Sequence, residues 1–529
     1  MDWRRELMGG LSSGIDINNY LTIEALENGL TVSLSTNACQ YCVDGDGNWK
    51  SLAANTATEA INNGQTLSFR GELSPAKNVG IGTFTISKKC NLLGNCMSML
   101  FGDNAANNYS LSSKTYAFYK LFYGCSNIVN VSENFLPATT LSRSCYEYMF
   151  FNCSGLVNSP KLPAKTLMNY CYQLMFCGCS SLMHASDLSA TTLAEYCYAS
   201  MFARCASLTA SPVLSATTLK QRCYSNMFYK CTSLTTAPAL PATTLATSCY
   251  LSMFEGCTNL TTAPELPATT LSDECYENMF KGCTSLVDAP ELPATTLAWM
   301  CYYYMFSGCT NLVNAPELPA TTVEGYCYCN MFYDCTSLVN APTLPATTLV
   351  DSCYYSMFSG CTKLNYIKML ATDISASNCL NDWVNGVASS GTFVKHPDMT
   401  TLLTGASGIP RGWTVINDGE ESGLTFPVTL VEGDNGQLGI DLFNYLIDKY
   451  DEQVSFNERS ITEQITINST AGSYYNGDVI NILTQINSIQ ETPTWIRMAT
   501  QSILNQGASW FSCDYFILYN NGYLEYYSD

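Results

Sequence analysis

The sequence predicts a repeat solenoid, because a 26-residue unit recurs nine times in phase, with no insertion between copies. Each unit holds a Cys-Tyr-x-x-Met-Phe block, and a second cysteine follows eight residues after the first. The first cysteines of the block are Cys145, Cys171, Cys197, Cys223, Cys249, Cys275, Cys301, Cys327 and Cys353. A fixed period of this length is typical of folds in which each unit buries its apolar face only against its neighbours.

The Cys-Tyr-x-x-Met-Phe-x-x-Cys block has the spacing of a short amphipathic helix. At about 100° per residue, both cysteines, the tyrosine, the methionine and the phenylalanine fall on one side. The residue before the first cysteine, and those two and three after it, point away and differ between copies. The pattern therefore predicts a helix of about two to three turns with one buried face.

The other half of each unit cannot be helical. Pro264 and Pro267 remove backbone donors, and they bias the residues before them towards extended geometry. Because such segments recur once per unit, we expect them to stack on one face as short parallel strands or as near-extended rungs. The β-branched Ala-Thr-Thr-Leu stretch that follows predicts a second short strand before the helix.

The unit resembles the BspA-like (Treponema pallidum-type) leucine-rich repeat, C-x-x-L-x-x-I-x-L-P-x-x-L-x-x-I-x-x-x-A-F-x-x-C. The residues that fill its positions in one copy are Cys257, Leu260, Leu266, Pro267, Leu271, Phe280 and Cys283. The copy departs from the motif in its 26-residue length, in Ala263-Pro264, and in Met279 where the family has alanine. The resemblance implies a right-handed, gently curved solenoid, a role in adhesion or recognition, and no catalytic residues.

The segments on either side of the repeats are predicted to form additional domains. Residues 20–110 contain alternating stretches such as 30–34, 65–69 and 82–86, and predict a β-sandwich-like domain. Residues 111–361 are predicted to form the solenoid of about ten repeats, the first of them degenerate. Residues 362–415 are predicted to form its C-terminal cap, in which Trp383 and Val384 replace methionine and phenylalanine. Residues 416–529 predict a small α+β domain with helices near 438–450 and 479–489 and a hairpin at Asn520-Asn-Gly522.

Residues 1–19 predict a tail. Its Trp3, Arg4 and Arg5 beside Met8-Gly-Gly resemble the N-terminus of many proteins of gut Bacteroidales phages and prophages. It lacks the apolar core of a secretory signal, and the sequence has no apolar run long enough to cross a membrane. The net charge of −20 argues against binding nucleic acid or an anionic membrane.

The 27 cysteines are predicted to be small buried hydrophobes. Two cysteines eight apart on one helix lie about 12 Å apart along its axis, too far for a disulfide. Disulfides between copies and a zinc site at Cys39, Cys42, Cys90 and Cys96 are the alternatives. Asp44-Gly-Asp-Gly-Asn48 imitates the start of a calcium loop, but Trp49 stands where that loop requires glycine, so a hairpin turn is expected.

Catalysis is not predicted, and neither is a cofactor or a metal. The two histidines, His184 and His396, lie on unrelated segments, which excludes most histidine-dependent constellations. The 44 acidic residues leave a carboxylate pair possible, but no spacing singles one out.

The predicted ligand-binding residues are aromatic side chains on the exposed face of the helices. They are Tyr170, Tyr196, Trp299, Tyr303, Tyr304, Tyr326 and Tyr355. Aromatic side chains on an exposed solenoid face suit contact with protein or sugar. Packing of each tyrosine against its counterpart in the next copy is the alternative.

Three functions remain open at this point. The first is a non-enzymatic virion protein of a gut bacteriophage, such as a tail fibre, spike or decoration protein. It would bind a host cell-surface protein or glycan and other virion proteins, and a trimer is the candidate homo-oligomer. The second is a bacterial cell-surface adhesin of the BspA-like kind. The third is an enzyme or an intracellular scaffold.

Overall fold

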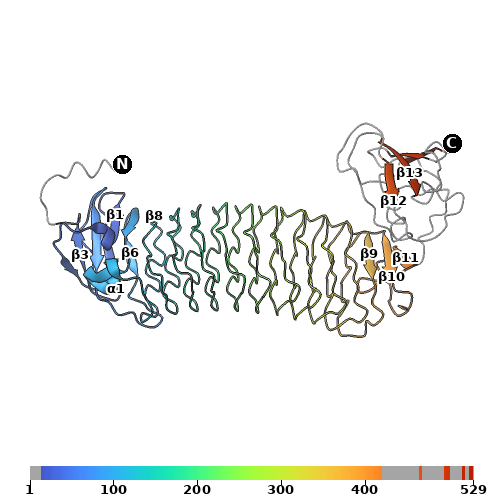
Figure 1. Ribbon diagram of the computed structural model, residues 1–529, viewed down its shortest axis with the longest axis horizontal. Helices are drawn as coiled ribbons and strands as arrows, with labels where there is room; N and C mark the ends of the chain where they lie inside the picture. Colours follow the sequence, from blue (N-terminus) through green and yellow to red (C-terminus); the bar gives the residue numbers. More distant parts are fainter. Residues whose placement is uncertain (1–13, 420–463, 468–493, 501–514, 519–523, 528–529) are drawn as a thin grey trace. The chain divides into compact units, whose positions relative to one another are not determined.

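The computed structural model describes residues 14–419 and four strands beyond them, at 464–467, 494–500, 515–518 and 524–527. The chain divides into two compact units, Met1–Asp418 and Gly419–Asp529. In the first unit, a β-rich part is followed by a row of stacked backbone loops, here called coils (Figure 1). Among the described residues, no helix is long and apolar enough to cross a membrane.

A six-stranded sheet and a two-stranded sheet make up the β-rich part. The six-stranded sheet has the order β4-β3-β5-β1-β7-β8, and β2 pairs with β6. The bounds are β1 Leu21–Ala25, β2 Val32–Leu34, β3 Cys39–Val43, β4 Lys50–Leu52, β5 Thr66–Arg70, β6 Phe84–Ile86, β7 Cys90–Gly94 and β8 Ile128–Val131. Phe69 and Phe84 join the two sheets edge to face, with ring centroids 5.2 Å apart. Short helices lie at Ile17–Asn19, Ser98–Phe101 (α1) and Gly102–Asn107.

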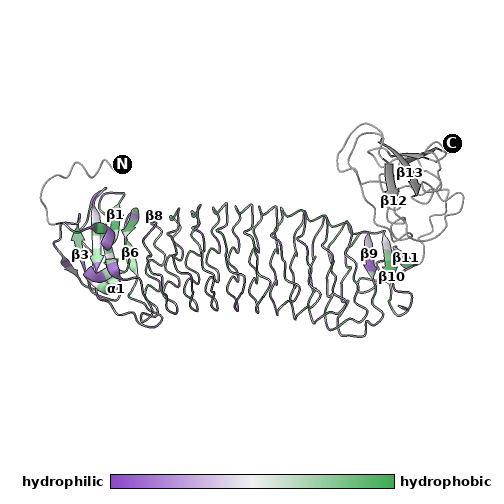
Figure 2. Ribbon diagram, in the orientation of Figure 1, coloured by the Kyte–Doolittle hydropathy of each residue, from purple (hydrophilic) through white to green (hydrophobic). Residues whose placement is uncertain are grey.

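The N-terminal sheet runs directly into the solenoid. Strand β8 belongs to the first coil, and it pairs in parallel with β7. Both hydrophobic and hydrophilic residues occur in the strands of this part (Figure 2), and Leu21, Ile23 and Leu92 are fully buried. The sheet therefore covers the first coil, which would otherwise expose unpaired backbone groups.

The Cys-Tyr-x-x-Met-Phe block is not helical, and that prediction is wrong. We define a turn block as the eleven residues from three before the first cysteine to seven after it. The turn blocks of coils 1 to 10 are 114–124, 142–152, 168–178, 194–204, 220–230, 246–256, 272–282, 298–308, 324–334 and 350–360. In each block the second to eleventh residues are consecutive turns, and Ala117 replaces the first cysteine in coil 1.

Hydrogen bonds between coils explain why no helix forms. The N–H groups of Tyr146 and Tyr148 donate to Cys171 and Gln173 of the next coil, over 3.0 Å each. The N–H group of Met149, which lies between such donors, bonds back to Tyr146 three residues earlier. A helix would direct every N–H to the carbonyl four residues before it. Here half of the donors are satisfied only because an identical coil lies alongside.

Every fourth residue of a turn block has a positive φ. In coil 2 these are Ser144, Tyr148 and Asn152, at 55°, 57° and 56°. For residues other than glycine this conformation costs about 1–2 kcal/mol. The third position is glycine in several coils, including Gly256, where φ is 75°.

Replacing Lys230 with glycine is expected to stabilise the protein by about 0.5–1 kcal/mol. Lys230 has a φ of 56° at the position that glycine fills in the next three coils. The relief of about 1–2 kcal/mol of backbone strain exceeds the entropic cost of glycine, about 0.5–1 kcal/mol. Urea denaturation followed by circular dichroism measures the difference. Lys220→Gly, at a residue without a positive φ, is the control and should destabilise.

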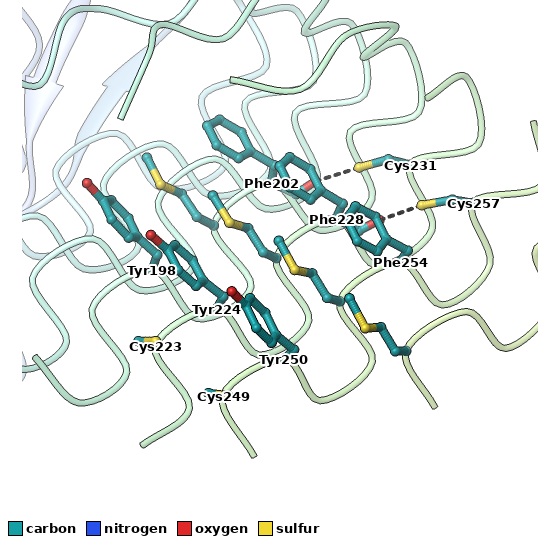
Figure 3. Packing of buried hydrophobic residues seen from close by; sticks show 14 of the residues in the cluster. Tyr198, Phe202, Cys223, Tyr224, Phe228, Cys231, Cys249, Tyr250, Phe254 and Cys257 are labelled. Atoms are coloured by element: carbon teal, nitrogen blue, oxygen red, sulfur yellow. Dashed lines mark hydrogen bonds between the residues drawn. The ribbon is translucent and has the colours of Figure 1, made fainter. Parts of the chain in front are cut away.

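The repeated apolar side chains form continuous buried columns, as the sequence predicts. Tyr198, Tyr224 and Tyr250 follow one another in the tyrosine column, and Phe202 and Phe228 lie in the phenylalanine column (Figure 3). Neighbouring rings stack nearly parallel, with centroids 5.8 Å apart for Tyr198 and Tyr224 and 5.9 Å for Phe202 and Phe228. Turn and helix bury the same side of this block, so the predicted face is right although the predicted backbone is wrong.

The second cysteine of each unit packs in the core and also forms a hydrogen bond to the preceding coil. Its thiol donates to the carbonyl of the phenylalanine in the preceding coil, as Cys231 does to Phe202 and Cys257 to Phe228, over 3.1 Å each (Figure 3). Burial raises the pKa of Cys257 to about 12, which keeps the thiol protonated as a donor. The 26 cysteines of the described residues are all free and buried.

The proline-containing half of each coil stacks in parallel, but it forms isolated bridges rather than full strands. Examples are Thr236 with Thr262, and Thr270 with Thr296 in the Ala-Thr-Thr-Leu stretch. Pro264 and its counterparts lack the N–H that would extend the ladder. Coils 1 and 10 hold Ser132 and Lys368 at that position and form the strands β8 and β9, whereas coil 3, with Ser186 there, forms only isolated bridges.

Two further coils follow coil 10. Strands β9 Tyr366–Met369, β10 Thr392–Lys395 and β11 Thr414–Asn417 form a parallel sheet in the order β11-β10-β9. Thr392 pairs with Tyr366 and with Thr414, so the first step is 26 residues and the second is 22. Trp383, at the methionine position of the next coil, is fully buried against Phe358, and its indole N–H donates to Gly408 O over 2.9 Å.

In the second unit the described residues are four strands of one sheet. They are β12 Gln464–Ile467, β13 Thr494–Thr500, β14 Tyr515–Leu518 and β15 Leu524–Tyr527, in that order. The first two are parallel, and β14 pairs antiparallel with β15; the predicted Asn-Gly turn between them lies outside the described residues. The helices predicted near 438–450 and 479–489, and most of the predicted N-terminal tail, lie outside the described residues.

Candidate binding surface

The outward side chains of the ten turn blocks form one surface, here called the turn face. Six of the seven aromatic residues predicted for binding are half-buried on it, and only Trp299 is largely exposed, at 43%. They do not project freely, because each ring packs against its own or a neighbouring coil. The turn face therefore presents ring edges and hydroxyl groups more than ring faces.

Tyr170 and Tyr196 form the first of two groups. Their rings stack, with centroids 4.9 Å apart and planes 15° apart. The guanidinium of Arg143 lies 4.6 Å from the Tyr170 centroid, and that of Arg222 lies 5.9 Å from the Tyr196 centroid. Both ends of the stack are thus held by cations, which leaves the edges of the rings and the arginine N–H groups for a partner.

The second group lies in coils 8 to 10. Tyr303 and Tyr304 meet edge to face, with centroids 4.6 Å apart, and the Lys281 ammonium lies 4.7 Å from the Tyr304 centroid. Trp299 meets Tyr326 edge to face at 6.5 Å, and Tyr355 lies in coil 10. Coils 5 to 7 separate this group from Tyr196, so the seven residues do not form a single site.

A third aromatic group, in coils 1 and 2, was not among the predicted binding residues. The Lys120 ammonium lies 5.1–5.3 Å from the ring centroids of Tyr119, Tyr123 and Tyr148. Tyr123, 41% exposed, also stacks on Phe151 at 4.9 Å. The aromatic residues stand at outward positions of the turn blocks. Aligning the degenerate first repeat at these variable positions would have identified them.

Glu274 and Glu277 lie together in coil 7. Burial, with the negative charge of Glu274, raises the pKa of Glu277 to about 7. Glu274 accepts a hydrogen bond from the Ser248 hydroxyl over 2.6 Å, and its carboxylate lies 3.8 Å from the Arg222 guanidinium. Glu277 therefore titrates near neutrality, within the turn face.

Replacing Glu277 with glutamine is expected to stabilise the protein above pH 7 and to have little effect below about pH 4. A carboxyl whose pKa is raised on folding is protonated at low pH in both states, so it contributes no difference there. As pH rises from the unfolded pKa of about 4.3 through the folded value, ionisation destabilises the native state. Urea denaturation of both proteins between pH 4 and pH 8 tests this. A stability difference that does not change with pH would contradict it.

The residues considered for metal binding do not come together. Cys39 and Cys42 lie on β3 and Cys90 lies on β7, with β5 and β1 between them. Three strand spacings amount to about 14 Å, too far for one zinc ion. No group of three metal-ligating side chains occurs among the described residues. The zinc alternative is therefore wrong.

The Asp44–Asn48 cluster is a turn. The Asp44 carboxylate accepts from the N–H of Thr66 over 2.8 Å, and that of Asp46 accepts from the N–H of Asn48 over 2.8 Å. Local donors thus engage both carboxylates, as in a hairpin connection.

The described residues also show no catalytic arrangement around either histidine. His184 is exposed and forms a parallel bridge with Asn158. His396 follows β10, and its Nδ1 accepts from the N–H of Asp398 over 3.2 Å.

Comparison with known proteins identifies the repeats. The family model described as "BspA type Leucine rich repeat region (6 copies)" matches residues 98–235, 221–330 and 291–381, which together span more than half of the 529 residues. A leucine-rich repeat protein from Bacteroides ovatus, solved at 1.19 Å, is 14% identical, with a TM-score of 0.20, over 57% of this chain and 87% of that one. No curated protein matches. The chain belongs to the BspA-type leucine-rich repeat family.

Proposed function

We propose that this chain is a non-enzymatic recognition protein of a bacterial cell surface, which binds a protein or glycan through the turn face. The observation that carries the proposal is that the coils differ from one another mainly at the outward positions of their turn blocks. Buried positions repeat the same residues from coil 2 to coil 10, whereas the outward turn positions hold tyrosine, arginine, glutamate, serine or lysine. A constant scaffold with a varied, partly aromatic surface suits recognition.

Membership of the BspA-type family supports the cell-surface interpretation, since adhesion or recognition is the role that this family implies. The family match carries no phage context, so the virion interpretation, with its tail fibre and its trimer, has no support from it. The cell-surface adhesin is therefore the interpretation we favour.

Immunogold labelling of the producing culture tests the location. We expect gold, directed by an antibody to the solenoid, on the cell envelope. Gold confined to phage particles would overturn the surface assignment and favour a virion protein. Gold confined to the cell interior would favour a scaffold.

Binding of the fluorescently labelled chain to bacterial and epithelial cells tests the surface. Tyr170→Ser combined with Tyr196→Ser should weaken binding about tenfold or more, as expected for aromatic residues at the centre of an interface. Tyr109→Ser is the matched control, because Tyr109 is 52% exposed and lies outside the turn blocks. Equal binding by all three proteins would remove this pair from the site.

A further inference from the structure

The charge of the turn face changes sign halfway along the solenoid. The turn blocks of coils 1–5 hold seven basic and two acidic residues, whereas those of coils 6–10 hold one basic and seven acidic. The first set is Lys114, Lys120, Arg143, Glu147, Glu195, Arg204, Lys220, Arg222 and Lys230. The second set is Glu255, Asp273, Glu274, Glu277, Lys281, Glu324, Asp334 and Asp351. In a chain of net charge −20, half of this face is positive.

The two halves also correspond coil by coil when they are compared outward from the middle. Coil 5, with three basic residues, corresponds to coil 6, with Glu255. Coil 4 is neutral, and coil 7 has three acidic residues and one lysine. Coil 2 has no net charge, and its corresponding coil 9 has two acidic residues. The two lysines of coil 1 correspond to Asp351 of coil 10. No pair of corresponding coils carries like net charge.

Coils 3 and 8 complete the correspondence, because neither has a charged residue in its turn block. Coil 3 presents Tyr170, and coil 8 presents Trp299, Tyr303 and Tyr304. Four of the seven aromatic residues predicted for binding thus lie on two uncharged coils at equal distances from the middle. Aromatic side chains flanked by charged ones are typical of the centre and rim of protein interfaces.

We propose that the turn face binds a second copy of this chain in antiparallel orientation, about a twofold axis between coils 5 and 6. Such an arrangement pairs each coil with its corresponding coil, twice over, as an isologous interface requires. A parallel, in-register arrangement would place the basic half on the basic half, which like-charge repulsion disfavours. This proposal rests on the proposed function, because it uses the same turn face, and it identifies the bound protein as a second copy of this chain.

Most charged residues of the turn face form no ion pair with another described residue. Among the ion pairs of residues 14–419, only the one between Arg222 and Glu274, 3.8 Å apart, joins two residues of the turn face. Arg204, Lys220 and Lys230 are exposed. Ten coils at about 4.8 Å each give a face about 50 Å long, enough for the roughly 800 Å² per partner of a stable interface.

An anionic polymer is the competing occupant. It would fit coils 1–5, but it would leave the acidic coils 6–10 without a partner. A second copy fits both halves, and for this reason we favour it.

Sedimentation velocity on the full chain, in about 50 mM and about 500 mM salt, tests the proposal. We expect a dimer at low salt that dissociates at high salt, because surface charges are screened there. The variant R204E/K220E/K230E makes coils 4 and 5 acidic, and E255K/D273K makes coils 6 and 7 more basic. Each variant alone should be monomeric, with a dissociation constant raised tenfold or more. Mixed together, they should form a heterodimer.

The control is K161E/K165E, which reverses two charges outside the turn blocks and should leave the dimer intact. Circular dichroism establishes that each variant is folded. A wild type that is monomeric at low salt, or two variants that do not recover association when mixed, would overturn the proposal. If such a monomer still binds cells or an acidic polysaccharide such as heparin, self-association fails while the proposed recognition function stands.

Discussion

Phe280→Ala is expected to lower the free energy of unfolding by about 3–5 kcal/mol. The side chain is fully buried, and its ring stacks between Phe254 at 5.7 Å and Phe306 at 5.6 Å. Truncation loses both ring contacts and leaves a cavity that cannot collapse, because the coils on either side are held by backbone hydrogen bonds. Phe280 N–H, for example, donates to Met305 O over 2.9 Å.

Urea denaturation followed by circular dichroism measures this cost. Phe280→Leu keeps most of the volume and should recover more than half of the loss, whereas Glu265→Ala, at an exposed residue, should be neutral. Because a solenoid is stabilised by contacts between neighbouring coils, we expect a comparable loss at Phe228 or Phe306. An unchanged unfolding transition for Phe280→Ala would mean that the stacked column is not a stabilising element.

The buried side of the solenoid was predictable from one copy of the repeat, and the backbone that supports it was not. Spacing alone placed Tyr276, Met279 and Phe280 on the buried side, and all three are buried. The same spacing suggested a helix, because helices and successive turns both return a side chain to one face every three to four residues. What distinguishes them is a hydrogen bond to the next coil, as from Tyr276 to Cys301, which no local propensity encodes.

One sequence signal did point away from a helix. Asn, Ser, Asp and Gly occupy many positions that turn out to have positive φ, such as Asn226, Ser252 and Gly282. These residue types tolerate the left-handed region or favour turns, and they are weak formers of helix interiors. Their recurrence every fourth residue was visible, but Tyr304 and Met300 at equivalent positions obscured it.

The candidate surface was predicted in position but not in detail. The tyrosines at the variable positions are half-buried, but small residues there, such as Ser144 and Ser248, are buried. Tyr170 and Tyr196 stack on each other rather than standing apart. That contact depends on two residues 26 apart being aligned, which the period reveals only after the direction of each side chain is known. The charge reversal between coils 5 and 6 needed no structure beyond the coil register, and it emerges only when the blocks are compared as one surface.

Trp383→Ala is expected to cost about 3–5 kcal/mol and to loosen the C-terminal coils before the rest of the solenoid. Trp383 packs against Phe358, the last ring of the phenylalanine column, with centroids 6.2 Å apart, and meets Phe393 edge to face at 6.1 Å. Its indole N–H also holds Gly408 O, so the truncated variant leaves that carbonyl without its donor.

Hydrogen exchange locates this effect. In Trp383→Ala, protection should fall first in β9, β10 and β11 and remain near wild-type values in coils 2 to 5, because each coil depends on its immediate neighbours. Trp383→Phe retains an aromatic ring but no donor, and should lose less. Uniform loss of protection along all ten coils would show that the solenoid unfolds as one cooperative unit. In that case the tryptophan would stabilise the whole stack, including the surface on which recognition is proposed.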